Sequence, residues 1–120
     1  MSDRVNWIEY KGARILYADY SGLSEREHLK VIEEFKNTLR QQPPGSVVTL
    51  TNVANTRTTE AVKEQYKVLI EQTRGISKGG AAIGITGFKK ALATLLKRDL
   101  YWANSLEDAK EWLAERARKR

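Results

Sequence analysis

The 120-residue sequence contains no cysteine, two prolines and a single histidine. The missing thiols exclude disulfides, thiolate metal sites and cysteine nucleophiles. The histidine, His28, has no second imidazole or carboxylate in its segment that would complete a metal site or a catalytic pair. We therefore interpret His28 as a structural residue, and we predict no catalytic residue, no metal site, no cofactor and no enzyme activity.

Long apolar runs are also missing. No stretch approaches the roughly 20 residues that cross a bilayer, and residues 1–4 show no apolar signal region. Hydrophobic residues make up 41% of the chain and charged residues 30%, which is typical of a globular protein. We expect one cytoplasmic domain over residues 1–120 and no membrane span.

Charge is distributed unevenly along the chain. Residues 1–73 hold ten basic and ten acidic residues, so the whole net charge of +6 lies in residues 74–120 and ends in a basic tail at 116–120. One interpretation is an anionic partner for this half. The other is that these basic residues lie on solvated helix surfaces, where cations near a helix C-terminus interact favourably with the helix dipole. Nucleic acid is not expected as a partner, because aromatic residues are not interleaved with the basic ones.

Hydrophobic periodicity predicts an alternating α/β order. Five strands are expected at residues 5–10, 14–19, 46–53, 81–85 and 100–102, with a loop over 74–80. Four helices are expected: after a capping box at Ser24 and Glu27, after Thr58 or Thr59, over residues 88–96, and after Ser105. In three of these helices, residues at helical spacing are expected to face inward. They are His28, Ile32, Phe35 and Leu39 in the first helix, Val62, Tyr66, Leu69 and Thr73 in the second, and Leu106, Ala109, Leu113 and Ala117 in the last.

The order β-β-α-β-α-β-α-β-α constrains the topology. Strands that alternate with helices pair in parallel through right-handed crossovers. The first two strands are joined by Lys11 and Gly12, which favour a hairpin. The sequence therefore predicts a mixed sheet of about five strands with one antiparallel edge strand.

Four segments resemble a known family in their order and spacing. They are GARILYAD (residues 12–19), SVVTLTNV (46–53), AIGITGFKK (82–90) and EDAKEWL (107–113). Over about residues 5–115 the chain resembles the SpoIIAA-like, STAS/SEC14-type small bacterial proteins. The resemblance implies a sheet of the anti-sigma-factor-antagonist type. It also implies a signalling role exercised by docking to partner proteins, often under the control of phosphorylation.

The phosphorylated relatives carry their acceptor between a strand and the next helix, which corresponds to residues 55–59 here. The resemblance implies Thr58 or Thr59 as the acceptor. Arg57 replaces the preceding acid of the family pattern, and Glu60 replaces the following glycine. Capping of the next helix by either threonine is the alternative.

Loops that follow parallel strands gather at the carboxyl edge of a sheet, where ligands collect. The candidate partner- or ligand-binding residues share this position, and they are Asp19, Ser21, Asn55, Arg57, Thr58, Thr59, Thr86, Gly87, Lys89, Lys90 and Asn104. Asp19 could instead form an Asx-turn. Free amides at a helix N-terminus beside Lys89 and Lys90 would favour an anion, although the segment is neither a Walker A loop nor a dinucleotide fingerprint.

The sequence favours a non-catalytic regulatory module that docks to another protein, and a homodimer stays open. The alternative is a small-ligand protein that binds an anion, nucleotide or lipid at the carboxyl edge of the sheet.

Overall fold

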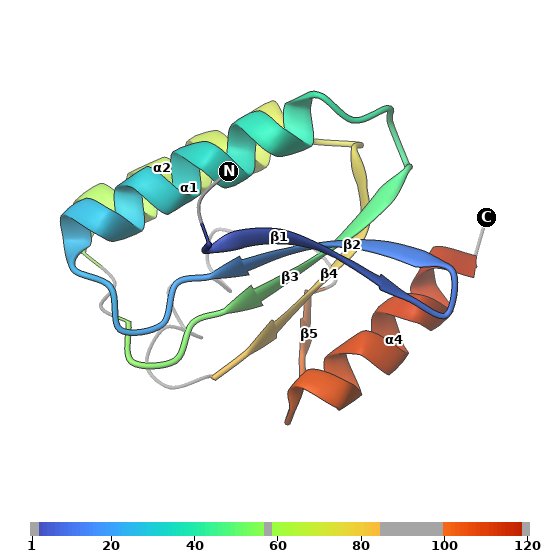
Figure 1. Cartoon of the computed structure of the whole chain (residues 1–120). Helices are drawn as coiled ribbons and strands as arrows, with labels where there is room; N and C mark the ends of the chain where they lie inside the picture. The colour runs from blue at the N-terminus through green and yellow to red at the C-terminus, as the bar shows by residue number, and fades with distance from the viewer. Residues whose placement is uncertain (1–2, 57–58, 85–99, 119–120) are drawn as a thin grey trace.

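The computed structural model describes residues 3–56, 59–84 and 100–118. The strands are β1 (Val5–Tyr10), β2 (Ala13–Asp19), β3 (Val47–Asn52), β4 (Ser77–Ile83) and β5 (Leu100–Trp102). The helices are α1 (Glu25–Arg40), α2 (Glu60–Gln72) and α4 (Leu106–Arg118) (Figure 1). No helix within these ranges is both long and apolar enough to cross a bilayer.

The five strands form one sheet in the order β1-β2-β3-β4-β5. β1 pairs antiparallel with β2, and every other pair is parallel. Lys11 and Gly12 join β1 to β2 with φ values of 49° and 83°, the positive values that a two-residue type I′ hairpin turn requires. The predicted mixed α/β sheet with one antiparallel edge strand is confirmed.

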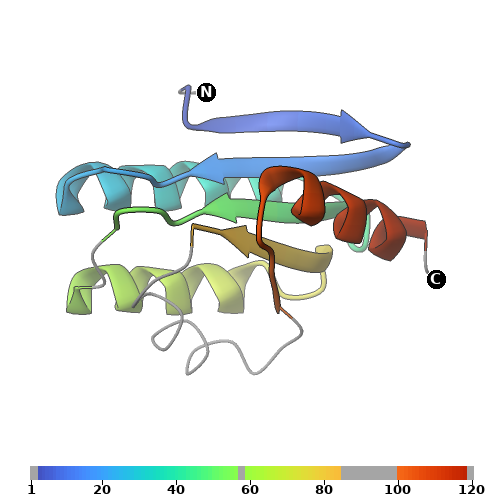
Figure 2. The same cartoon turned by 90° about the horizontal axis from the view of Figure 1, so that it is seen from below.

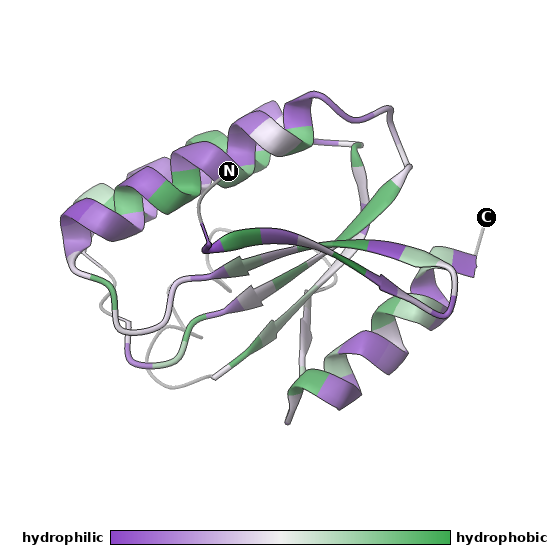
Figure 3. Cartoon of the chain, in the orientation of Figure 1, coloured by the Kyte–Doolittle hydropathy of each residue, from purple (hydrophilic) through white to green (hydrophobic). Residues whose placement is uncertain are grey.

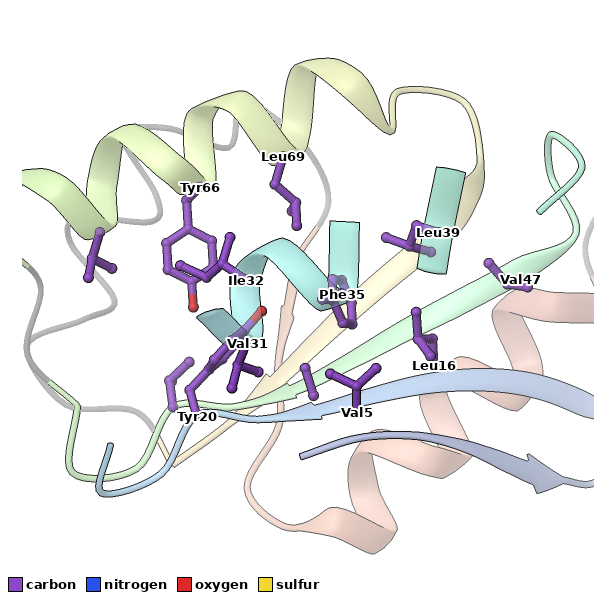
Figure 4. Packing of buried hydrophobic residues seen from close by; sticks show 13 residues of the cluster. Val5, Leu16, Tyr20, Val31, Ile32, Phe35, Leu39, Val47, Tyr66 and Leu69 are labelled. Atoms are coloured by element: carbon purple, nitrogen blue, oxygen red, sulfur yellow. The ribbon is translucent and has the colours of Figure 1, made fainter. Parts of the chain in front are cut away.

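Helices cover the sheet on both faces. α1 and α2 lie side by side on one face, and of the described helices α4 covers the other (Figures 1 and 2). Apolar and polar residues alternate along all three helices (Figure 3), as expected for helices that bury one side against a sheet. The apolar side chains beneath α1 and α2 form one core cluster, part of which is drawn in Figure 4. A second cluster lies beneath α4.

The helix beginnings are as predicted. The Ser24 hydroxyl accepts from the backbone N–H of Glu27, and the Glu27 carboxylate accepts in return from the backbone N–H of Ser24. All eight predicted inward residues of α1 and α2 are buried. Their helical spacing therefore identified the packed side of both helices correctly.

Two predictions were wrong, and a third lies outside the described residues. β4 begins at Ser77 and not at residue 81, so much of the predicted loop over 74–80 is strand. The tertiary reason is that α4 packs closely here: a Cβ on Gly79 would lie 2.8 Å from Cγ of Arg116.

Leu106 is 38% exposed and does not point inward, because it is the first residue of α4. The helix predicted over residues 88–96 falls in the undescribed part, so the described ranges contain three helices.

His28 is the polar centre of the core beneath α1 and α2. Its side chain is only 1% exposed, and its ring stacks on Tyr20 with centroids 4.7 Å apart. The Nε2 atom lies 2.9 Å from the hydroxyl of Tyr66. The three rings thereby join the end of β2 to both helices. Figure 4 shows Tyr20 and Tyr66 pointing toward one another across this core.

Burial controls the protonation of this cluster. It lowers the pKa of His28 from 6.5 to about 4, and it raises the pKa values of Tyr20 and Tyr66. The imidazole therefore stays neutral at pH 7, and both phenols stay protonated. Among the buried side-chain atoms of the described residues, the hydroxyl oxygen of Tyr20 has no hydrogen-bond partner.

The neutral His28 predicts a loss of stability in mild acid. Between pH 6.5 and about 4, His28 is protonated in the unfolded chain but stays neutral in the folded chain. Protonation therefore stabilises the unfolded state, and the free energy of unfolding falls as the pH is lowered through this window. The expected loss is about 2–3 kcal/mol, measured by urea unfolding at pH 7.0 and 4.5. In a His28→Phe variant the slope between these pH values should be much smaller, whatever its absolute stability. An unchanged slope would contradict the assignment.

Candidate functional site

Backbone hydrogen bonds connect the loops after the parallel strands to the ends of the neighbouring strands and, in one case, to the neighbouring loop. The N–H of Tyr20 donates to the carbonyl of Asn52 at 2.9 Å. The same pattern continues along the edge, from Gly22 N to Ala54 O (3.3 Å), from Val53 N to Ile83 O (2.9 Å) and from Ala103 N to Ala82 O (2.9 Å). The ladder thus extends beyond the strand ends. We call this edge the carboxyl rim, because the parallel strands β2 to β5 all end there.

Gly84 fixes the spacing between two of these loops. Its φ is +78°, and a Cβ there would lie 2.6 Å from the backbone nitrogen of Ala54. Only glycine combines this backbone conformation with such a close approach. The loop after β3 is therefore packed directly against the end of β4.

Asp19 and Ser21 form a closed group on the rim. One carboxylate oxygen of Asp19 accepts from both the backbone N–H (2.9 Å) and the hydroxyl (2.5 Å) of Ser21. The other lies 3.4 Å from Nη1 of Arg4, which also donates to the carbonyl of Ser21 at 3.0 Å. This is the Asx-turn that the sequence left as an alternative for Asp19.

Tyr17 and Asn52 form a second polar pair, on the face of the sheet that carries α4. The backbone N–H of Ala54 donates to Oδ1 of Asn52 at 3.1 Å, and Nδ2 of Asn52 lies 3.5 Å from the hydroxyl of Tyr17. Tyr17 is half-buried, and burial raises the pKa of its hydroxyl. The phenol therefore stays a proton donor at neutral pH.

The predicted site residues lacked Tyr17 and Arg4, and Asn52 was predicted at this edge only as the first residue of the loop over 52–59. Strand alternation places Tyr17 and Asp19 on the same face, and this signal was present in the sequence. The sequence contained no signal for the pairing of Asp19 with Asn52, because that pairing depends on which strand lies next to β2.

The remaining described candidates are spread along the rim. Asn55 is exposed, with a φ of 54° in the left-handed region that asparagine tolerates. Asn104 is exposed after β5, three strand spacings or about 14 Å from β2. The rim therefore brings Asp19 and Ser21 into contact, but it does not bring Asn104 to them.

Thr59 caps α2. Its hydroxyl accepts from the backbone N–H of Val62 at 3.2 Å, which is the capping alternative stated for this residue. Phosphorylation at Thr59 stays a prediction. The other predicted site residues lie outside the described residues, and they are Arg57, Thr58, Thr86, Gly87, Lys89 and Lys90.

Two further features were considered as binding sites. A shallow hollow of about 440 Å³ is lined by Asn37, Arg40 and Gln41 near the end of α1, at the opposite edge of the sheet. Within the described ranges, no three histidine, aspartate or glutamate side chains lie close enough together to hold a metal ion.

Comparison with known proteins adds no assignment. No protein-family model, curated protein or solved structure matches this chain. The resemblance to SpoIIAA-like proteins therefore depends on the four sequence segments alone.

Substitution of Gly84 should test how tightly the rim is built. Gly84→Ala places a methyl group against the backbone of Ala54 in a left-handed conformation, and it should lower the free energy of unfolding by about 3 kcal/mol. Gly22→Ala is the matched control. Gly22 has a similar φ of +68° but open space around a Cβ, so about 1 kcal/mol is expected. Urea unfolding measures both, and equal losses would show that the contact with Ala54 contributes nothing.

Proposed function

We propose that this protein is a non-catalytic regulatory module that docks to another protein through the carboxyl rim. The observation that carries the proposal is the backbone hydrogen bonding that ties the described loops of the rim to the ends of the neighbouring strands and, at Gly22 and Ala54, to one another. Loops that are joined in this way are already ordered before a partner binds. A preordered surface loses little conformational entropy on binding, which favours recognition.

The chemistry of the rim supports binding more than catalysis. General acid–base catalysis needs a group that titrates near the working pH and can reach a substrate proton. The one imidazole, His28 on the inner side of α1, is buried and is held neutral. The carboxylate of Asp19 is occupied by Ser21 and Arg4. These groups hold the loops in place.

The sequence resemblance points in the same direction. STAS/SEC14-type proteins act by docking to partners, and the α/β sheet with one antiparallel edge strand is compatible with that fold. We extend the proposal to a cytoplasmic bacterial signalling role in which Thr58 or Thr59 is phosphorylated. The capping hydrogen bond of Thr59 to Val62 is what a phosphate would disturb there.

Site-specific photocrosslinking tests the proposal. A benzophenone amino acid is introduced at Asn104 or Glu60, two exposed rim positions, and at Gln41, an exposed position at the opposite edge. After irradiation in the native host, the tagged protein is purified and attached proteins are identified by mass spectrometry. One protein should be attached from both rim positions and not from Gln41. Attachment from Gln41 at the same yield, or from none of the positions, would contradict docking at the rim.

The small-ligand alternative predicts a different outcome. A ligand that binds only the folded state raises the melting midpoint by mass action. A midpoint that rises with nucleotides, inorganic phosphate or lipid headgroups, together with an absence of crosslinks, would favour that function over docking.

A further inference from the structure

β1 is an outer strand of the sheet, and in the described part of the chain no strand lies beside its outer edge. Its six residues stay in continuous register with β2. Figure 2 shows β1 farther out than α1 and α4, so its outer edge extends beyond both helices. The other outer strand, β5, is only three residues long. A regular outer strand of the length of β1 is a template for pairing with a further strand.

The usual devices that prevent such pairing are missing from β1. Proteins protect outer strands with proline, lysine or a β-bulge, or by keeping them short. β1 contains neither proline nor lysine, and its register with β2 shows no bulge. Its single charged residue, Glu9, is the register partner of the oppositely charged Arg14 on β2. The sequence of β1 therefore permits another strand to approach.

Antiparallel pairing decides which backbone groups of β1 point outward. Along such a ladder, hydrogen-bonded residue pairs alternate with non-bonded pairs. The N–H of Asp19 donates to the carbonyl of Arg4 at 2.8 Å, so these two residues form a bonded pair. Counted from there, Val5, Trp7 and Glu9 belong to non-bonded pairs, and their N–H and carbonyl groups point away from β2. These groups supply donors and acceptors along the outer edge.

The three outward residues are arranged symmetrically about Trp7. A twofold axis through Trp7 places a second β1 antiparallel to the first, with Trp7 opposite its own copy and Val5 opposite Glu9 of the second copy. Every outward group of both strands is then used, in about six hydrogen bonds. A shift of two residues in either direction would place Val5 or Glu9 opposite a residue outside β1. The outer edge is thus complementary to itself.

The side chains that meet in this register also fit one another. Trp7 is half-buried, and the guanidinium carbon of Arg14 lies 4.3 Å from its ring centre. Two Trp7 rings in contact across the axis would cover each other's exposed surface, and cross-strand aromatic pairs stabilise a sheet. Asp3 and Lys11 are exposed, carry opposite charges and lie just beyond the two ends of β1, so each comes opposite the other in the second copy. Lys11 also contacts Glu111 of its own chain at 2.6 Å.

We propose that β1 pairs with β1 of a second copy of this chain, which joins two five-stranded sheets into one. The two strands run antiparallel, so the carboxyl rims of the two copies lie at opposite ends of the joined sheet and take no part in the contact. The dimer therefore goes beyond docking at the rim and does not depend on it. One strand from each copy makes a small interface, and we expect a dissociation constant in the micromolar range.

Proline at position 9 tests the pairing of the backbones. Glu9→Pro removes an outward N–H but no hydrogen bond between β1 and β2. Glu9→Ala is the matched control, because it loses the same carboxylate and keeps the N–H. Sedimentation equilibrium over a concentration series should show dimers of similar affinity for the wild type and Glu9→Ala, and dimers about tenfold weaker for Glu9→Pro. The melting midpoint reports whether Glu9→Pro is folded.

Introduced cysteines test the register independently, since the chain has no cysteine of its own. The axis through Trp7 places Asn6 opposite Ile8 of the second copy in a non-bonded pair, with Cα atoms about 4.5 Å apart and within reach of a disulfide. Under mild oxidation, a mixture of Asn6→Cys and Ile8→Cys should form the linked heterodimer several-fold faster than either variant links to itself. This measurement decides the question if Glu9→Pro does not fold.

Several results would overturn the proposal. A wild type that stays monomeric at every concentration would exclude the dimer. An equal dissociation constant for the wild type and a folded Glu9→Pro would place the contact elsewhere on the molecule. Equal weakening in Glu9→Pro and Glu9→Ala would assign the effect to the carboxylate and not to the backbone. Equal rates of disulfide formation in the mixture and in each variant alone would exclude the register about Trp7.

Discussion

The parallel pairing of β2, β3 and β4 is the constraint on which the rest of this structure depends. Because it continues past the strand ends, the first residue after β2, β3 and β5 donates to the end of the neighbouring strand, and Gly22 donates to Ala54 of the next loop. Gly84, directly after β4, lies so close to the backbone of Ala54 that any side chain at this position would collide with it. Hydrogen-bonded loops of this kind resist local opening better than loops that contact only water. The order of the described part of the carboxyl rim therefore depends on the sheet as well as on particular loop residues such as Gly84.

The two faces of the sheet are built differently. On the face beneath α1 and α2, the rings of Tyr20, His28 and Tyr66 connect one strand to both helices. A buried polar group is costly unless it is hydrogen-bonded, and His28 meets this condition through Tyr66. These residues are inaccessible, so their chemistry serves the core.

The face that carries α4 has a different character. Two polar contacts join the middle and the last turn of α4 to the sheet: Glu111 accepts from Lys11 of the hairpin at 2.6 Å, and Arg116 donates to the carbonyl of Lys78 at 3.1 Å. Both contacts lie at the edge of the sheet opposite the carboxyl rim. α4 is thereby held where the parallel strands begin, and this leaves Tyr17 and Asn52 partly exposed where they end.

The sequence by itself determined the local elements. The spacing of His28, Ile32, Phe35 and Leu39 and the capping box at Ser24 depend on residues within one helix, and the Lys11–Gly12 turn depends on two neighbours. Patterns of this range are readable because α-helices and strands repeat every 3.6 and 2 residues. The alternating order of elements then limited the sheet to a mixed, largely parallel arrangement.

Only the tertiary structure decided which residues meet across elements. The early start of β4 depends on α4 packing against Gly79, and the exposure of Leu106 depends on where α4 first contacts the sheet. Asn52 reaches Tyr17 because β3 lies beside β2 in one particular register, 35 residues apart in sequence. Periodicity reports which side of an element is apolar, but it contains no information about the identity of the neighbouring strand. For that reason the sequence located the carboxyl rim, whereas the polar pair beside it required the fold.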